Sequence, residues 1–486
     1  MASEITRFMQ EICATIDSDD YPSLLDKVLR SGLPTKNAIR RIAIFSFTLS
    51  RGGLERVALL LTKMFLERGF AVTLFTTLYV EHEYAVPDGV ERVVLPRGRR
   101  ERWESLNREL RDREIDLCLF NDHTQFETFY DISCAKAAGC RIVATEHSMF
   151  FYPFYDANTP IFEIRTQAYR VVDALTCLTQ SDQLWWRAAG CSKAVHIPNP
   201  STFQSVEIQQ TSGESKQVLF VGRISDGKGL KFLPALIGKV TQRCAEARFV
   251  LAGAFPDREA ESWFQREIEK YGVADSVETP GIVDNVSEYY ARSSVVVILS
   301  AVEGFSMVRV EAQAHGVPVV MFDMAYLDGI SSDDGCIMVG KEDVSGMADA
   351  VVRLLQDRNH WSEMSTRARN SFVRQGNIDV GEMWESLFCS ILRGTVEEDF
   401  TPRKVADQAF LAMTMREMAA GMRYHRPYAE RFDYLKPVDK FLSRVFPRGS
   451  ARRGAVSGVL NSVRTYLRNR RETRRRRKQF KAMREQ

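Results

Sequence analysis

Long apolar runs are missing from this 486-residue sequence, and their absence argues against one class of protein. No stretch reaches the roughly 18 consecutive apolar residues that a membrane-spanning helix needs. The segment from Met1 to Ile39 also lacks the apolar centre of a secretory signal peptide. We therefore expect a protein that stays in the cytoplasm.

Paired cysteines are missing as well. The nine cysteines are odd in number and contain no C-x-x-C pair, so neither a disulfide framework nor a zinc site built on them is indicated. Acidic groups at 17–20 and 331–334 are isolated, which makes them a weak indication of a magnesium site. We expect the cysteines to be reduced residues of the core.

The length and composition of the chain indicate a globular protein of more than one domain. A chain of 486 residues, 45% hydrophobic and 27% charged, is globular and longer than one core usually supports, so two or three domains are expected. The net charge of +3 hides an asymmetry. Residues 401–486 contain 23 Lys and Arg against 7 Asp and Glu, a net +16, which leaves −13 for the first 400 residues. An acidic body carries a basic tail.

Strand-like apolar runs alternate with helical patterns over residues 40–393. One example is the run at 41–47, which precedes a helical pattern at 54–68. Such alternation predicts parallel sheets covered by helices, an α/β fold. A stretch rich in Ser, Gly and Gln at 201–216 indicates a linker. The expected divisions are an extension at 1–39, domains at 40–205 and 206–396, and a basic, helical C-terminal extension at 397–486.

The stretch from Glu303 to Val320 lies between two apolar runs, so its helix is expected to connect two parallel strands. Glu303 would then lie in the loop at the carboxyl end of a strand, where ligands bind in such sheets. Ser306 is expected to be the helix N-cap and Gly316 to end the helix. This places Glu311 inside the helix, near its second turn.

The start of the same helix is a candidate anion site. The peptide N–H groups of Phe305, Ser306 and Met307 would have no partner within the helix and could bind a phosphate. Glu303 and Glu311 on either side can accept hydroxyl hydrogen bonds. The combination suits a molecule that carries phosphates and several sugar hydroxyls.

Two cations follow a strand of the second domain. The strand-like run that begins at Gln217 ends in Gly222 and Arg223, and Lys228 lies five residues after Arg223 in a glycine-containing loop. Arginine offers a planar fork to phosphate oxygens and lysine a point charge. We expect both to bind a phosphate group.

Two loops of the first domain contain further candidates. Gly52 and Gly53 stand between a strand and a helix, where glycine lets the backbone approach a phosphate. His147 follows another strand, and its imidazole can donate a hydrogen bond to a sugar hydroxyl or a phosphate. His123, also at a strand end, is a second histidine candidate.

These motifs resemble family 4 of the retaining glycosyltransferases with GT-B architecture, in which two Rossmann-like domains face each other across a cleft. The resemblance covers about residues 40–393. Pro200 departs from it, because the family usually has glycine there. The matching segments are Gly52-Gly-Leu-Glu-Arg-Val57, Thr145-Glu-His147, Ile197-Pro-Asn-Pro200, Val221-Gly-Arg-Ile-Ser-Asp-Gly-Lys-Gly229, and the two acids Glu303 and Glu311 separated by seven residues.

The resemblance implies a role for each donor-side residue. Arg223 and Lys228 would hold the leaving diphosphate of a UDP-, GDP- or ADP-sugar. Glu311 would accept hydroxyls of the ribose and Glu303 those of the transferred sugar. Preorganised cations stabilise the charge that develops on the leaving phosphate.

The other implied roles belong to the base and the reacting sugar. Ile282 and Val283 would line the nucleobase pocket through their backbone. Gly53 would approach the phosphate from the first domain, and His147 would order the sugar near the acceptor. The family further implies retention of the anomeric configuration and no requirement for a metal or other cofactor.

The implied activity is transfer of a sugar to a glycan or lipid-linked acceptor in the synthesis of envelope polysaccharide or glycoconjugate. Two alternatives from other classes remain open. A sugar-nucleotide epimerase or hydrolase would consume the donor without an acceptor. A non-catalytic scaffold would bind a nucleotide sugar, or no ligand, without turnover.

The aromatic run at 149–155 allows two interpretations. Aromatic faces stack on sugar rings and pack against lipid chains, so the run is a candidate acceptor site. The same residues can instead pack between the two domains.

The basic tail allows three interpretations: an anionic membrane surface, a nucleic acid, or solvent. No RNA-binding or helix-turn-helix pattern accompanies the tail, so nucleic acid is disfavoured. We expect the tail to hold the protein on the inner face of the cell membrane.

Overall fold

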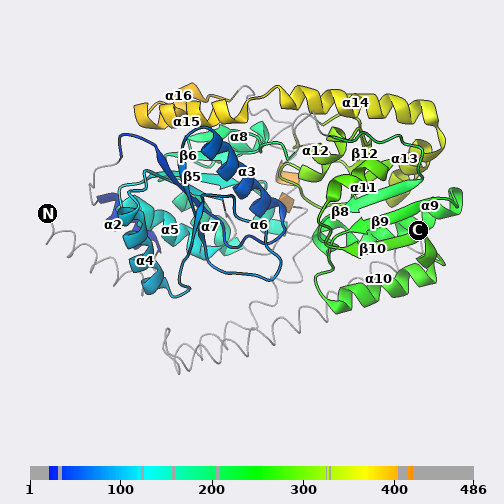
Figure 1. Ribbon diagram of the computed structural model, residues 1–486, viewed down its shortest axis with the longest axis horizontal. Helices are drawn as coiled ribbons and strands as arrows, with labels where there is room; N and C mark the ends of the chain where they lie inside the picture. The colour runs from blue at the N-terminus through cyan, green and yellow to red at the C-terminus, as the bar shows by residue number, and fades with distance from the viewer. Residues whose placement is uncertain are drawn as a thin grey trace.

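The computed structural model describes residues 21–30, 36–121, 125–155, 159–202, 208–324, 326–327, 330–402, 414–416 and 418–419. Within these ranges the chain forms two lobes side by side, each built on one parallel sheet (Figure 1). The predicted α/β fold with two Rossmann-like domains is confirmed.

The first lobe contains a seven-stranded sheet in the order β3-β2-β1-β4-β5-β6-β7. All four residues of β4 are buried, as expected for a parallel strand covered by helices on both faces. The strands are β1 (Arg41–Phe45), β2 (Ala71–Thr76), β3 (Glu91–Val94), β4 (Leu117–Phe120), β5 (Arg141–Glu146), β6 (Ala174–Cys177) and β7 (Ala194–His196). The helices are α2 (Tyr21–Arg30), α3 (Gly53–Glu67), α4 (Arg99–Asp112), α5 (Phe126–Ala137), α6 (Tyr152–Tyr155), α7 (Thr159–Ala168) and α8 (Gln180–Ala188).

The second lobe contains a six-stranded sheet in the order β10-β9-β8-β11-β12-β13. Its strands are β8 (Gln217–Val221), β9 (Arg248–Ala252), β10 (Val277–Gly281), β11 (Val295–Ile298), β12 (Val319–Phe322) and β13 (Cys336–Val339). Its helices are α9 (Leu233–Arg243), α10 (Arg258–Lys270), α11 (Val286–Arg292), α12 (Met307–Ala314) and α13 (Val344–Gln356), followed by α14 (Arg358–Gly376), α15 (Val380–Arg393) and α16 (Val396–Asp399).

The strand order of each sheet changes direction beside its first strand. In the first sheet this happens between β1 and β4, and in the second between β8 and β11. The loops after these strands separate at that point and leave room for a ligand at the carboxyl edge of the sheet. Two such points are therefore available, one in each lobe.

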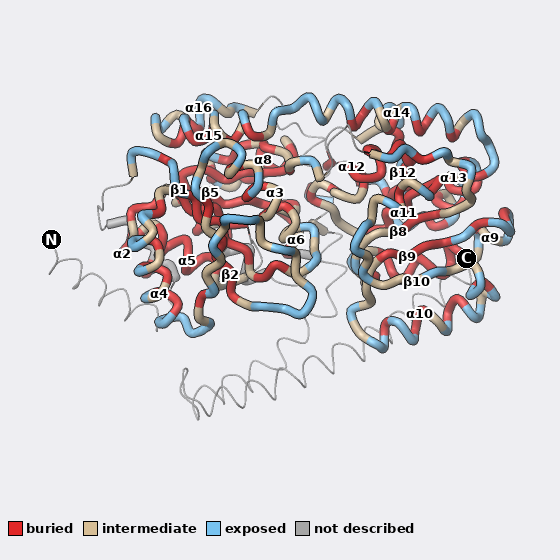
Figure 2. The backbone as a smooth tube through the Cα atoms, in the orientation of Figure 1, coloured by how far each residue is buried: buried red, intermediate tan, exposed pale blue. Residues whose placement is uncertain are grey.

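Buried apolar residues of the sheets and of the helices that cover them form the cores of the two lobes. In Figure 2 the exposed positions lie mainly on the outer helices and loops. The eight cysteines in the described ranges are free thiols, and all except Cys389 are buried. The prediction that the cysteines are reduced residues of the core is confirmed for these seven. Among the described residues, no group of His, Cys, Asp and Glu is arranged to hold a metal ion.

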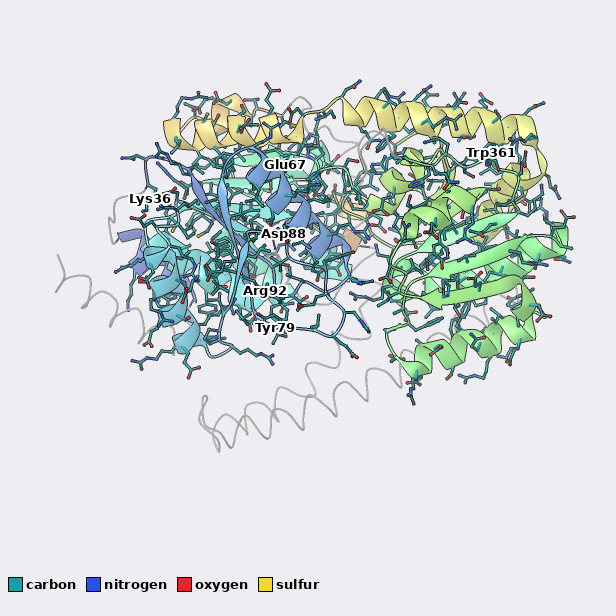
Figure 3. The ribbon with its side chains drawn as sticks, in the orientation of Figure 1. Lys36, Glu67, Tyr79, Asp88, Arg92 and Trp361 are labelled. Atoms are coloured by element: carbon teal, nitrogen blue, oxygen red, sulfur yellow. The ribbon has the colours of Figure 1, made fainter. Side chains whose placement is uncertain are left out.

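The last helices run along one edge of both lobes (Figure 1). Trp361 fastens the start of α14 to the second lobe, because its indole N–H donates to the carbonyl oxygen of Ser294 at 2.7 Å (Figure 3). The next helix, α15, packs on the first lobe instead. The rings of Trp384 and Phe388 lie 5.5 and 5.6 Å from the ring of Phe65. The expected return of the chain toward the first domain is confirmed, although these residues fall within the predicted range 206–396.

The extension at 1–39 is described in part. Its amphipathic pattern forms α2, whose Leu24 and Val28 are buried against the first lobe. Most of the predicted tail at 397–486 lies outside the described residues. In the part of the chain that is described, no helix combines the length and apolarity needed to cross a membrane.

Candidate functional site

The carboxyl edge of the second sheet brings Lys228 and Glu303 together. Lys228 follows β8 and Glu303 follows β11, so both lie where the strand order of this sheet reverses. The Nζ of Lys228 lies 2.7 Å from Oε1 of Glu303. Arg223 lies exposed at the end of the same β8 strand. The structure thus places three of the predicted residues at one sheet edge.

The lysine loop depends on Gly229. This residue has φ +87°, and a Cβ there would lie 2.9 Å from the carbonyl carbon of Leu299. Only glycine combines this left-handed conformation with such a close approach. The turn brings the Lys228 loop against the end of β11, which explains the contact with Glu303.

Glu311 lies in the second turn of α12, as predicted, but its partners were not foreseen. Its carboxylate is buried and accepts at Oε1 from Nη1 of Arg56 at 2.5 Å and from the Thr202 hydroxyl at 3.3 Å. The Tyr290 hydroxyl donates to Oε2 at 2.9 Å. Arg56 belongs to the first lobe, so this ion pair joins the two lobes.

The start of α12 differs in one respect from the prediction. Ser306 occupies the N-cap position, but its φ of +63° is left-handed and its hydroxyl makes no capping hydrogen bond. The buried Ser306 Oγ has no hydrogen-bond partner in the described part of the chain. Phe305 and Met307 are half-buried beside it. Gly316 has φ +71° just after the helix and ends it as expected.

Gly304 marks the contact between the loops of the two lobes. A methyl group at this position would clash with the carbonyl oxygen of His147 and would lie 2.9 Å from Cα of Ser148. The backbone of Gly304 does not have a positive φ. Glycine is therefore required for the close approach and not for the conformation.

The His147 imidazole is held by a residue that the sequence analysis did not select. Its Nε2 lies 2.5 Å from Oδ1 of Asn121, and Nδ2 of Asn121 donates to the carbonyl oxygen of Leu54 at 2.9 Å. Burial lowers the pKa of His147 to about 3, so the ring is neutral at physiological pH. Asn121 occupies Nε2, and the predicted donation from His147 to a ligand stays a prediction.

A buried ion pair lies beneath the His147 loop. Nη2 of Arg165 contacts Oε2 of Glu146 at 2.6 Å, and both side chains are almost completely buried. Burial raises the pKa of Glu146 to about 7, although Arg165 favours its charged form. No pattern in the sequence indicated this pair. It fixes the end of β5, from which His147 projects.

The glycine turn of the first lobe is open at the helix start. A Cβ on Gly53, the first residue of α3, would meet nothing within 4 Å, whereas one on Gly52 would clash with the Glu55 carboxylate. Space beside a helix N-terminus permits the expected approach of a phosphate. Arg51 in the same turn pairs with Asp284 of the second lobe.

The remaining candidates follow β10 or lie outside the described residues. Ile282 is 49% exposed and Val283 packs against the apolar cluster of the second lobe. Both lie at the carboxyl edge of the sheet, where β9 and β8 separate β10 from β11. His123 lies outside the described residues.

Two rings of the aromatic run, Phe150 and Phe151, pack within and between the lobes. The ring of Phe151 is buried 5.0 Å from that of Tyr326 in the second lobe. Phe150 lies between Trp185 and Trp186 of the first lobe, at 5.1 and 4.9 Å. Packing between the domains is therefore correct for Phe151, whereas Phe150 packs within the first lobe. Both rings are buried, which does not favour a role in stacking on an acceptor.

Two family models match the chain, one on each lobe. The model described as Glycosyltransferase Family 4 matches residues 51–200, and the model described as Glycosyl transferases group 1 matches residues 215–357. They account for 150 and 143 residues, or 293 of 486, which is more than half of the chain.

Two curated relatives match part of the chain. The exopolysaccharide phosphotransferase SCO2592 of Streptomyces coelicolor is 26% identical over 246 residues, which are 49% of this chain and 25% of that protein. The GalNAc-alpha-(1->4)-GalNAc-alpha-(1->3)-diNAcBac-PP-undecaprenol alpha-1,4-N-acetyl-D-galactosaminyltransferase of Campylobacter jejuni is 26% identical over 235 residues, 47% of this chain and 63% of that one. The chain thus spans less than two thirds of either relative.

A solved structure shares the fold over a larger part of the chain. The Anabaena protein Alr3699/HepE, in complex with UDP and glucose, superposes with a TM-score of 0.63 at 14% identity. The superposition covers 72% of this chain and all of that one. With one family model on each of its two Rossmann-like lobes, the chain belongs to the family 4 glycosyltransferases of GT-B architecture.

Proposed function

We propose that the chain transfers a sugar from a nucleotide-sugar donor to a glycan or lipid-linked acceptor, with retention of the anomeric configuration. The observation that carries this proposal is the contact between Lys228 and Glu303 at the carboxyl edge of the second sheet. A cation for the leaving phosphate and a carboxylate for sugar hydroxyls lie side by side there. The fold leaves room for a ligand at the same edge.

The donor would extend along this edge. Lys228 and Arg223 attract the diphosphate, and their positive charge stabilises the negative charge that grows on the phosphate as the sugar leaves. Glu303 is oriented by Lys228 and accepts hydroxyls of the transferred sugar. Glu311 accepts hydrogen bonds from the ribose hydroxyls. Arg56 competes with the ribose for Oε1 of this carboxylate.

The first lobe would close over the donor from the other side. The open helix start at Gly53 offers peptide N–H groups to the diphosphate. His147 lies against Gly304, so the imidazole loop approaches the reacting sugar when the lobes are together. Closure excludes water, which would otherwise hydrolyse the donor.

The names of the relatives suggest where the reaction belongs. The Campylobacter jejuni relative is named for transfer to an undecaprenol-linked glycan. The Streptomyces coelicolor relative is named as a phosphotransferase, but this chain covers a quarter of it. We therefore propose a role in the synthesis of envelope polysaccharide or glycoconjugate, at the inner face of the membrane, with the basic tail on anionic lipid.

Binding of donors tests the proposal. A thermal-shift screen would use UDP-, GDP- and ADP-sugars, beginning with UDP-glucose because the Anabaena structure contains UDP and glucose. A bound donor at a hundred times its Kd stabilises the folded chain by about 2.7 kcal/mol. Lys228→Ala should lose this stabilisation. Lys270→Ala is the matched control, because Lys270 forms a similar pair with Glu267 on α10.

The outcomes separate the proposal from its alternatives. No stabilisation by any nucleotide sugar, with Lys228→Ala behaving like the parent, would refute it. Consumption of donor without an acceptor would indicate a hydrolase or epimerase. NMR of the product linkage tests retention, and activity in the presence of EDTA tests the expected independence from metal.

A further inference from the structure

Asn121 occupies the point in the first sheet where the strand order reverses. It follows β4 directly, while the glycine turn follows the neighbouring β1 strand. Its side chain is completely buried, although it lies at the sheet edge that faces the site. A buried amide at this place requires an explanation, because it must satisfy its polar atoms inside the protein.

The two ends of the Asn121 amide bridge two functional loops. One end contacts the carbonyl oxygen of Leu54, in the first turn of α3, at 2.9 Å. The other end contacts Nε2 of His147 at 2.5 Å. The amide thus joins the glycine turn to the histidine loop.

The chemistry of these contacts determines where the histidine proton lies. The Leu54 carbonyl can only accept, so the amide NH2 must face it. The amide oxygen therefore faces His147, and an oxygen can only accept as well. Nε2 must consequently carry the hydrogen, which leaves Nδ1 as the unprotonated nitrogen of a neutral ring.

A second histidine in the chain has the opposite arrangement. Nδ1 of His315 lies 2.8 Å from the carbonyl oxygen of Glu311, and its Nε2 lies 2.6 Å from the Ser287 hydroxyl. Because the carbonyl only accepts, Nδ1 of His315 carries the hydrogen. The two histidines therefore carry their hydrogen on opposite ring nitrogens, His147 on Nε2 and His315 on Nδ1. His315 can serve as the reference signal for the Nδ1–H form in an NMR spectrum.

The surroundings of His147 favour the neutral form. Burial lowers the pKa of His147 to about 3. Glu146, the adjacent carboxylate, faces Arg165 instead.

We propose that Asn121 is a positioning residue for sugar transfer, which holds His147 in its Nε2–H form and ties it to the first turn of α3. The inference rests on the proposed function for its catalytic meaning. Any hydrogen bond that Nδ1 makes must then be one that it accepts. Asn121 thereby fixes the ring as an acceptor at Nδ1 and holds the histidine loop against the first turn of α3.

The test uses full-length protein labelled with 15N at its seven histidines. NMR should show His147, assigned by its loss in His147→Gln, as an Nε2–H imidazole, and His315 as the Nδ1–H reference. Asn121→Asp places a carboxylate against Nε2 and should raise the pKa of His147 from about 3 to roughly 4 to 6. A His147 proton on Nδ1 in the parent, or an unchanged pKa in Asn121→Asp, would overturn the proposal.

Kinetics test the positioning role separately. Asn121→Ala should lower kcat by roughly tenfold to a hundredfold, as expected for a small misplacement, with little change in the donor KM. In a His147→Gln background the same change should cost nothing more, since Asn121 acts through His147. Independent, multiplicative effects would contradict it. Because the NMR experiment needs no substrate, lack of turnover with every nucleotide sugar would count against the proposed function, while the spectra would still decide the proton position.

Discussion

Adding one methyl group at Gly304 should separate the two lobes at the site. The new Cβ would lie 2.9 Å from Cα of Ser148, whereas ordinary contacts begin at 3.4 Å. The loops must therefore move apart by at least 0.5 Å there, and by more at the carbonyl oxygen of His147, where the clash is closer. The shift falls between the imidazole loop and the acid that is proposed to hold the sugar.

The expected cost follows from that displacement. A misplacement of about 1 Å between reacting groups lowers the rate by about a hundredfold. Gly304→Ala should therefore reduce kcat/KM by about that factor. Each lobe should keep its fold, because the backbone at Gly304 has no left-handed strain that alanine would aggravate.

The measurement is a steady-state assay with the nucleotide sugar found in the binding screen, together with thermal unfolding. Gly376→Ala serves as the control, since a Cβ at that position meets nothing within 4 Å and its φ is not positive. A Gly304→Ala enzyme that retains kcat/KM within about threefold of the parent would refute the proposed closure of the lobes in the reaction.

Three further predictions concern other parts of the chain. Arg56→Met leaves the buried Glu311 carboxylate without its cation and should lower the free energy of unfolding in urea by about 3 kcal/mol; a change below about 0.5 kcal/mol would contradict this, and Glu311→Gln in the same background should restore part of the loss. The folded-state pKa of Glu146 is about 7 against an ordinary 4.5, so the folded chain binds the extra proton and its stability should fall as the pH rises through that window. Glu146→Gln should remove this slope, and an unaltered pH profile would show that another group causes it. Truncation before Thr401 should abolish binding to anionic vesicles and leave donor binding intact; unchanged vesicle binding would reject the membrane role of the tail.

Local patterns were sufficient to predict most of the fold. The helix expected at 54–68 is α3 at Gly53–Glu67. Glycine turns, apolar runs and caps are short-range signals, and the order of strands and helices followed from them. The acids of the second lobe were likewise placed correctly in a loop and a helix.

Contacts between distant residues could not be predicted in the same way. Arg56 lies 255 positions from Glu311, and no local pattern distinguishes it from a surface arginine of an amphipathic helix. Asn121 looked like an ordinary residue after a strand, and its role depends on where two other loops lie. The left-handed Ser306 also escaped prediction, because a serine before a helix normally indicates an extended N-cap.

The packing of α15 has a consequence for synthesis on the ribosome. Phe65 emerges early, but Trp384 and Phe388, which cover it, are made more than 300 residues later. A nascent first lobe would expose part of its apolar surface until α15 has left the ribosome. Because the covering helix is synthesised so much later, the first lobe must either be shielded by a chaperone or complete its packing late.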